Sequence, residues 1–321
     1  MVQSNADAAP VAEVPFTYAA PEHGRLKRLV IRAVERITGQ PRLKRLYMEN
    51  QRQPLAGESF WDAAVRLLRL EIRIGGAGLA AIPRSGPVVV LANHPFGVLD
   101  GIVIAHLVAQ VRDDFKVLTN SVLYRAPEAR PNLLPIDFAE TRQARDTNLR
   151  SRAAAHDLLR AGGCLVVFPG GTVSTVTGLL KRRAFDPVWK PFAGQLIRKS
   201  AATVVPVFFA GQNSRLFQLA SHLSMTLRLA LLFKEVARRI GTPLPVVIGD
   251  AIPAPALAGF ADATALVQHL REQTYALGGV RAPGELKRLA GWRADGGVRA
   301  PYAKASSAAN RRSTSSTRPN R

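Results

Sequence analysis

The chain has 321 residues, 47% of them hydrophobic, which is enough for one large domain with a sizeable core and appendages. Lysine and arginine number 44 against 23 aspartate and glutamate residues, so the formal net charge is +21. This charge predicts an anionic partner: acidic lipid headgroups, a phosphate-bearing substrate, an acidic carrier protein or nucleic acid. The single cysteine, Cys164, excludes an internal disulfide framework and a cysteine-rich metal site, and fits a reducing cytoplasm.

No apolar stretch approaches the roughly 20 residues of a membrane-spanning helix, and residues 1–9 do not resemble a secretory signal. We therefore expect a soluble or peripheral protein. Residues 1–20 are rich in alanine, proline and polar side chains, which predicts disorder.

Residues 21–70 are predicted to be basic, amphipathic and helical. Between Gly24 and Asn50, apolar and basic side chains alternate at helical spacing. Such a helix can lie in an anionic lipid interface, or it can be an ordinary surface helix packed on the core. The sequence leaves both readings open. A second helical stretch covers Trp61–Leu70.

Residues 71–280 alternate between apolar strands and helices, which predicts an α/β fold with a mixed, largely parallel sheet flanked by helices. The predicted strands are Glu71–Ile74, Val88–Ala92, Phe115–Leu118, Cys164–Phe168, Thr203–Phe209 and Pro245–Gly249. The predicted helices are Gly101–Val111, Arg142–Ala161, Leu216–Ile240 and Ala261–Ala276. Pro206, inside a strand, suggests a sheet edge or a bulge. Residues 281–321 read as a disordered basic tail.

The most informative segment joins the strand at Val88–Ala92 to the following helix. His94 stands where the chain leaves the sheet, and Asp100 precedes the helix. Strand ends in α/β sheets line substrate clefts, and an imidazole there suits a general base for an alcohol. A carboxylate beside it would fix the ring tautomer. Read separately, His94 could be structural and Asp100 a helix cap.

Two further strands end in small or polar residues. The strand at Cys164–Phe168 runs into Pro169, Gly170 and Gly171, where backbone N–H groups could approach an anion or an oxyanion. Hydroxyl groups of Thr172 and Ser174 follow, and a tight turn without function is the alternative. After the strand at Thr203–Phe209, Asn213 and Ser214 could contact substrate, although capping of the next helix is the simpler interpretation.

Together these segments resemble the glycerolipid, or lysophosphatidic acid, acyltransferase family, and most closely its bacterial hemolysin-like branch, some of whose members are associated with ornithine-lipid synthesis. The resemblance covers about residues 88–253. It implies the glycerolipid acyltransferase fold with N-terminal amphipathic helices, His94 as general base and Asp100 as its orienting partner. The candidate substrate-binding residues are Asn93, Phe96, Gly97, Phe168, Pro169, Gly170, Gly171, Thr172 and Asn213.

The chain departs from the family pattern in several places. Five residues, not four, separate His94 from Asp100, a spacing that also resembles the hemolysin-like branch. Gly170 stands where many members have glutamate, Val173 where many have arginine, and Asp137 near a basic position. These losses favour an acceptor without a free phosphomonoester, such as a lyso-ornithine lipid.

The resemblance implies an acyl carrier protein or coenzyme A thioester as co-substrate, no other cofactor, and location on the cytoplasmic face of the inner membrane. Cys164 is expected in the core, and the histidines show no metal-ligand spacing. The alternatives are a nucleic-acid-binding protein, a non-catalytic protein that binds anionic lipid, and an esterase. No zinc finger or RNA-recognition signature accompanies the charge, and no Gly-x-Ser-x-Gly run marks a hydrolase.

Overall fold

The computed structural model describes residues 17, 24–120, 124, 126–137, 141–178, 181–223 and 225–282. The chain divides into two compact units, Met1–Ala282 and Pro283–Arg321, and every described residue belongs to the first. The disorder expected at residues 1–20 and 281–321 falls, apart from residues 17, 281 and 282, outside the described part of the chain.

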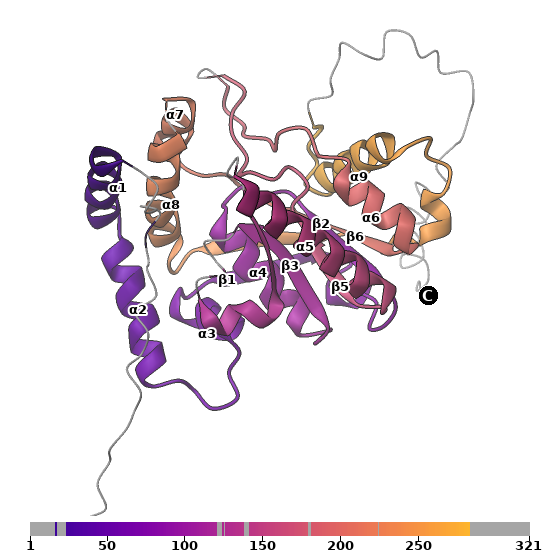
Figure 1. Cartoon of the computed structure of the whole chain (residues 1–321), viewed down its shortest axis with the longest axis horizontal. Coiled ribbons are helices and arrows are strands. Elements are labelled where there is room, and N and C mark those ends of the chain that lie inside the picture. The colour runs from indigo at the N-terminus through magenta and orange to yellow at the C-terminus, as the bar shows by residue number, and fades with distance from the viewer. Residues whose placement is uncertain are drawn as a thin grey trace, which may run out of the picture. The chain divides into compact units, whose positions relative to one another are not determined.

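A seven-stranded sheet forms the centre of the described unit, with strands in the order β1-β7-β6-β2-β5-β3-β4 (Figure 1). The strands are β1 (Glu71–Gly76), β2 (Val88–Ala92), β3 (Phe115–Asn120), β4 (Leu133–Ile136), β5 (Cys164–Val167), β6 (Thr203–Phe209) and β7 (Pro243–Ile248). All neighbours pair in parallel except β6 and β7, which are antiparallel. The predicted mixed, largely parallel sheet is confirmed.

Helices cover both faces of this sheet. They are α1 (Arg25–Ile37), α2 (Gln40–Arg52), α3 (Phe60–Leu67), α4 (Val98–Ala109), α5 (Arg142–Arg160), α6 (Phe192–Ser200), α7 (Arg215–Leu223), α8 (Met225–Arg239) and α9 (Ala263–Leu277), with 3-10 turns at Leu79–Ala81, Pro127–Asn132 and Ala254–Leu257. Alternate residues of β2 separate two cores: Val88 and Val90 pack with α4 and α8, whereas Val89 and Leu91 pack with α5, α6 and α9. Strand alternation thus produces two hydrophobic layers.

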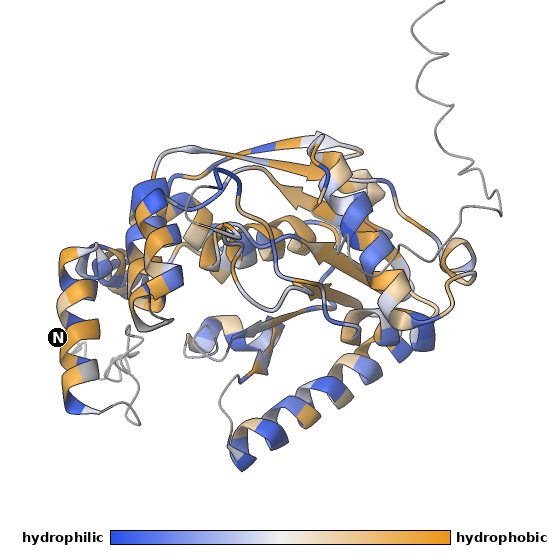
Figure 2. Ribbon diagram, turned by 90° about the horizontal axis from the view of Figure 1, so that it is seen from above, coloured by the Kyte–Doolittle hydropathy of each residue, from blue (hydrophilic) through white to orange (hydrophobic). Residues whose placement is uncertain are grey.

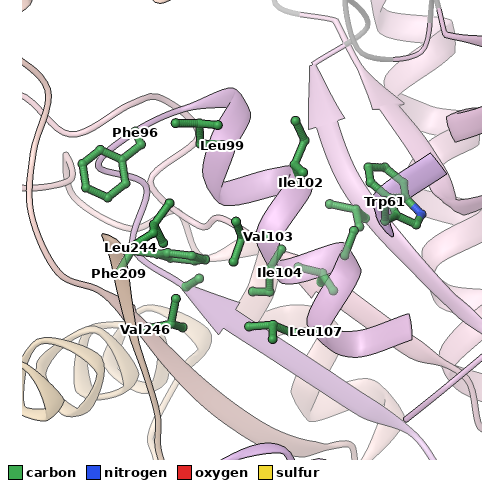
Figure 3. Close-up of a cluster of buried hydrophobic side chains, with 14 of the residues drawn as sticks. Trp61, Phe96, Leu99, Ile102, Val103, Ile104, Leu107, Phe209, Leu244 and Val246 are labelled. Atoms are coloured by element: carbon green, nitrogen blue, oxygen red, sulfur yellow. The ribbon is translucent and has the colours of Figure 1, made fainter. Parts of the chain in front are cut away.

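The core beneath α4 explains why this helix is apolar on nearly all sides. Phe96, Leu99 and Val103 lie close to Phe209 and Leu244, side chains of β6 and β7 (Figure 3). The strands are predominantly hydrophobic along their length. In α5, hydrophilic and hydrophobic residues recur along the helix, as in a helix with one face in solvent (Figure 2). The helix α4 is therefore rigidly held, and so is the turn that precedes it.

Pro206 lies in β6, between β2 and β7, so of the two expectations the sheet edge is wrong. The bulge is supported, because the antiparallel register shifts by one residue between the two sides of Pro206. Its carbonyl accepts the N–H of Gly249, and the next pairing on that side is the bridge of Val204 with Ile252. The proline nitrogen thus falls at a gap in the pairing, where no donor is required.

The N-terminal segment forms two helices, α1 and α2, that break at Gly39. Gly39 has φ of +101°, and a Cβ there would come within 2.7 Å of the Ala237 side chain on α8. Only glycine combines that conformation with so close an approach. The helix expected at Leu216–Ile240 is described as α7 and α8, on either side of residue 224, which lies outside the described part of the chain. None of the helices that the structure describes is long and apolar enough to cross a bilayer.

Candidate active site

The carboxyl ends of β2, β3, β4 and β5 meet at one edge of the sheet, because these strands are parallel. A cavity of about 590 Å³ opens there, as expected outside the carboxyl ends of strands in such a fold. Its apolar lining consists of Val98, Leu118, Ile136, Val167, Phe168, Val173, Phe192, Ala193, Leu229 and Leu232. The cavity suits an aliphatic chain.

His94 lies at the wall of this cavity, two residues beyond the end of β2. Its side chain is 19% exposed, and its ring lies against that of Phe168, with the centroids 4.2 Å apart. Phe168, the residue after β5, thus packs against one face of the imidazole ring. Both residues stand at the parallel strand ends, where the sequence predicted a cleft.

Asp100 is fully buried at the start of α4, with Oδ2 3.0 Å from Nδ1 of His94. The same Oδ2 accepts the backbone N–H groups of Phe96 and Gly97 at 2.8 and 2.9 Å. The carboxylate therefore closes the turn and holds the imidazole at once. The ring contact is short but bent, outside straight hydrogen-bond geometry, which leaves the pair room to tighten when substrate binds.

Burial raises the pKa of Asp100, and this effect outweighs the opposing pull of His94 and of the N–H groups of Phe96 and Gly97. The other carboxylate oxygen, Oδ1, is buried and has no hydrogen-bond partner among the described residues. One of the two carboxylate oxygens of Asp100 is thus left without hydrogen bonds from the described residues, which agrees with the raised pKa.

Asp186 holds the main chain of His94, a role that sequence reasoning missed. Its Oδ1 accepts the backbone N–H of His94 at 3.0 Å and the hydroxyl of Ser174 at 2.5 Å, and its Oδ2 accepts the indole N–H of Trp189 at 2.9 Å. The backbone N–H of Ser174 donates to the carbonyl of His94 at 2.8 Å. Both main-chain groups of His94 are therefore fixed. Asp186 lies outside the regular elements, 92 residues from His94, with no local motif to mark it.

The turn after β5 presents Phe168, Pro169, Gly171 and Thr172 to the cavity, as expected, whereas Gly170 does not line it. The N–H of Gly171 donates to the carbonyl of Phe168 at 2.9 Å, so this donor is already used within the turn. Gly171 has φ of +71°, and the Lys190 ammonium would lie 3.4 Å from a Cβ placed there. A cationic side chain therefore lies over the turn.

Of the candidates around His94, Gly97 lines the cavity, while Asn93 and Phe96 do not. The side-chain amide of Asn93 is hydrogen-bonded to β6: it accepts the N–H of Phe209 at 2.7 Å and donates to the carbonyl of Phe209 at 3.0 Å. The Phe96 ring is buried, with the Arg239 guanidinium 4.2 Å from its centroid. The structure thus gives Asn93 and Phe96 contacts with neighbouring elements.

Asn213 also lies away from the cavity; it is buried, and neither side-chain polar atom has a hydrogen-bond partner in the described part of the chain. The neighbouring hydroxyl of Ser214 accepts the N–H of Phe217 at 3.3 Å and donates to Glu235 at 2.5 Å. The capping interpretation is confirmed for Ser214.

A charged side chain from a distant segment lies near each of the two positions where the sequence pattern lacks a charge. A Cβ at Gly170 would lie 3.1 Å from that of Asp186, so a carboxylate already occupies this space. The Arg228 guanidinium, from α8, donates through Nη2 to the carbonyl of Val173 at 2.6 Å. Asp186 and Arg228 thus approach Gly170 and Val173 from distant segments, and of the two only Arg228 lines the cavity.

Arg152, Lys190 and Arg228 line the cavity, and no aspartate or glutamate is among the described residues of its wall. The described residues contain no group of three or more His, Cys, Asp or Glu side chains that could hold a metal ion. Cys164 is fully buried in the core, and burial raises the pKa of its thiol to about 12. It is therefore an unreactive core residue, as expected.

A family profile described as "Acyltransferase" matches residues 47–278, a range that includes every residue lining the cavity. A lyso-glycine lipid O-acyltransferase of Phocaeicola vulgatus is 24% identical over 264 residues, which cover 77% of this chain and 89% of the relative. A protein of the same name from Bacteroides thetaiotaomicron is 23% identical over 251 residues, 76% of this chain and 88% of the relative. The solved 1-acyl-sn-glycerophosphate (LPA) acyltransferase of Thermotoga maritima, 16% identical, has a TM-score of 0.43 over 80% of this chain and 83% of its own.

Proposed function

Since this chain belongs to the acyltransferase family, we propose that it transfers a fatty acyl group from an acyl thioester to a hydroxyl group of a lysolipid. The observation that carries this proposal is the contact of His94 with buried Asp100 at the wall of an apolar cavity. A base and a lipid-compatible cavity are the two elements that the reaction requires.

With Nδ1 facing Asp100, Nε2 of His94 is the nitrogen left to take the acceptor's hydroxyl proton. The alcohol oxygen attacks the thioester carbonyl and forms the new ester bond as the carbon–sulfur bond breaks. The imidazolium then returns the proton to the departing thiolate of acyl carrier protein or coenzyme A. Asp100 stabilises the imidazolium meanwhile. No covalent enzyme intermediate is required.

The acceptor that we propose is a lysolipid with an amino-acid headgroup. Two relatives are named lyso-glycine lipid O-acyltransferases, and the cationic, acid-free wall of the cavity suits a carboxylate. Glycine has no hydroxyl, so an O-acyl acceptor built on it must carry the hydroxyl on its fatty chain. The lyso-ornithine lipid expected from sequence has the same kind of headgroup.

Membrane association is the second part of the proposal, and α1 and α7 would provide it. The apolar side chains that both helices leave exposed are Leu26, Leu29, Val30, Ile37, Leu216, Leu219 and Leu223. Exposed arginines accompany them, Arg25, Arg32 and Arg36 on α1 and Arg215 on α7. Both helices pack on α8, whose other residues line the cavity. An anionic bilayer would therefore dock beside the site.

The activity test compares the wild type with His94→Ala, and uses His156→Ala as a control histidine away from the cavity. Purified protein is given acyl carrier protein or coenzyme A thioester and a hydroxylated N-acylglycine, and both the ester product and free fatty acid are measured. The wild type and the control should form ester, and His94→Ala should not. Ester formation by folded His94→Ala would refute the base assignment. Free fatty acid as the main product would indicate an esterase.

The membrane test is sedimentation with vesicles of phosphatidylcholine alone or with added phosphatidylglycerol at physiological salt. Leu29→Ser combined with Ile37→Ser should weaken binding to the anionic vesicles. Leu55→Ser, another exposed leucine outside α1 and α7, should not. Equal binding by all three proteins would contradict the assignment of this surface.

A further inference from the structure

Arg228 stands out among the cationic residues of the cavity because it is half-buried, whereas Arg152 and Lys190 are exposed. Burial lowers the pKa of its guanidinium, since water no longer solvates the charge fully. Its neighbours include the ring of Phe217, 6.0 Å from the guanidinium carbon, and the apolar Leu229 and Leu232 on the same helix.

The guanidinium makes one hydrogen bond within the described part of the chain, from Nη2 to the Val173 carbonyl at 2.6 Å. None of the described carboxylates forms an ion pair with it, although buried arginines ordinarily have such a partner. The remaining N–H groups of the guanidinium have no hydrogen-bond partner among the described residues. Because Arg228 lines the cavity, these groups can donate to a ligand there.

One peptide group connects Arg228 to the catalytic histidine. The carbonyl of Val173 accepts from Arg228, and the N–H of the same peptide, on Ser174, donates to the carbonyl of His94 at 2.8 Å. The two hydrogen bonds and the peptide between them span less than about 8 Å. This path ends on the main-chain carbonyl of His94, so it fixes Arg228 relative to the backbone of that residue. Because both residues also line the same cavity, the carboxylate and the chain hydroxyl of one acceptor can be bound together.

We propose that Arg228 binds the carboxylate of the acceptor's headgroup and so places the acceptor's hydroxyl at His94. This assignment rests on the proposed function for the identity of the acceptor. The planar guanidinium matches a carboxylate with two parallel hydrogen bonds, and the apolar surroundings strengthen them. The acyl chain of the acceptor lies along the apolar wall.

The experiment measures binding, so it needs no turnover. Isothermal titration of the whole protein uses two soluble probes, N-(3-hydroxydecanoyl)glycine and the corresponding glycinamide, which lacks the charge. The proteins are the wild type, Arg228→Met, Arg228→Lys and Arg238→Met. Arg238 is an exposed arginine of the same helix, so its replacement removes the same charge without touching the cavity. Thermal melting shows that each variant is folded.

The wild type and Arg238→Met should bind the carboxylate about 10- to 100-fold more tightly than the amide. Arg228→Met should bind both probes alike, and Arg228→Lys should recover part of the preference. A wild type that does not distinguish the probes would overturn the proposal, as would an equal loss of both probes in Arg228→Met. A third titration uses coenzyme A: if Arg228→Met weakens its binding and keeps the preference for the carboxylate, the arginine serves the donor's phosphates instead.

These outcomes are separate from those of the acyl-transfer assay. A protein that binds the glycine probe through Arg228 but transfers no acyl group would refute the proposed reaction and leave the carboxylate site standing. Active transfer with no preference for the carboxylate would refute the carboxylate site and leave the proposed reaction standing. Where transfer is active, Arg228→Met should raise KM for the acceptor and also lower kcat, because the hydroxyl is no longer placed at His94.

Discussion

Asp186 accepts the backbone N–H of His94 and the hydroxyl of Ser174 on one carboxylate oxygen, and the indole N–H of Trp189 on the other. Each of these partners is a donor, so only a carboxylate can satisfy all three without turning one of them. The N–H of Asp186 in turn donates to the hydroxyl of Tyr275 at 2.8 Å. The position of His94, the proposed base, therefore depends on a loop residue that does not line the cavity.

Asp186→Asn should reduce kcat by about 10- to 100-fold and leave KM nearly unchanged, because an amide NH₂ would face either Trp189 or the pair formed by His94 and Ser174. The unmatched donor should also cost about 1–3 kcal/mol of unfolding free energy. Steady-state kinetics below the melting temperature separates the two effects. Ser174→Ala, which removes one donor but keeps the contact to His94, should be milder. A variant that is destabilised but keeps the wild-type kcat would contradict the positioning role.

Asp100→Asn should lower turnover by several orders of magnitude, about 10⁴ by analogy with the serine-protease triad, while the fold is retained. The amide oxygen can still accept the N–H groups of Phe96 and Gly97, so the turn stays closed. The neutral side chain no longer stabilises an imidazolium. Single-turnover rates with circular dichroism measure both properties. In Asp100→Ala the same two N–H groups lose their acceptor, and this variant should also be less stable.

The raised pKa of Asp100 predicts a specific dependence of stability on pH. The native state holds this proton at higher pH than the unfolded chain does, so protonation of Asp100 favours folding. Its contribution is complete below the unfolded pKa of about 4 and is lost as pH rises through the folded pKa. Urea unfolding of His94→Ala, with and without Asp100→Asn, isolates the carboxyl from the imidazole. The stability advantage of the carboxyl-bearing protein should fall as pH rises; an advantage that grows would show that the ionised form is the better accommodated one.

Asn93→Ala should destabilise the protein by about 2–4 kcal/mol, because it leaves the buried N–H and carbonyl of Phe209 without partners. The acceptor's KM in the folded fraction should stay close to that of the wild type, since Asn93 does not line the cavity. Chemical denaturation and kinetics at low temperature give the two values. A large rise in KM with unchanged stability would instead support the substrate-binding role expected from sequence.

Sequence patterns predicted the strands well because strands buried on both faces read as unbroken aliphatic runs. Both β2 and β6 begin and end where the sequence placed them. The predicted helix starting at Gly101 begins three residues earlier, at Val98, because Asp100 caps the turn from inside the first helical turn. The break between α1 and α2 at Gly39 depends on a close approach to Ala237 of α8, which local periodicity does not report.

The contact between His94 and Asp100 could be expected from sequence because both residues lie in one short turn. Asp186 and Arg228 could not, because they reach the site from a loop and a helix with ordinary surface-like patterns. Sequence alone also could not show that Asp186 lies beside Gly170 and that Arg228 contacts the main chain of Val173. Contacts between side chains from distant segments can be predicted only once the topology of the fold is known.

The pairing of β1 with β7 has a consequence for biosynthesis. Glu71 of β1 pairs with Pro243 of β7. The first strand to be synthesised therefore cannot pair until the last strand has been synthesised. Until Ile248 has emerged, the growing polypeptide carries an unpaired strand edge and an α4 without the apolar floor that β7 provides. It follows that the core beneath α4 is completed late in translation, and that nascent chains truncated before β7 expose apolar surface to chaperones and to one another.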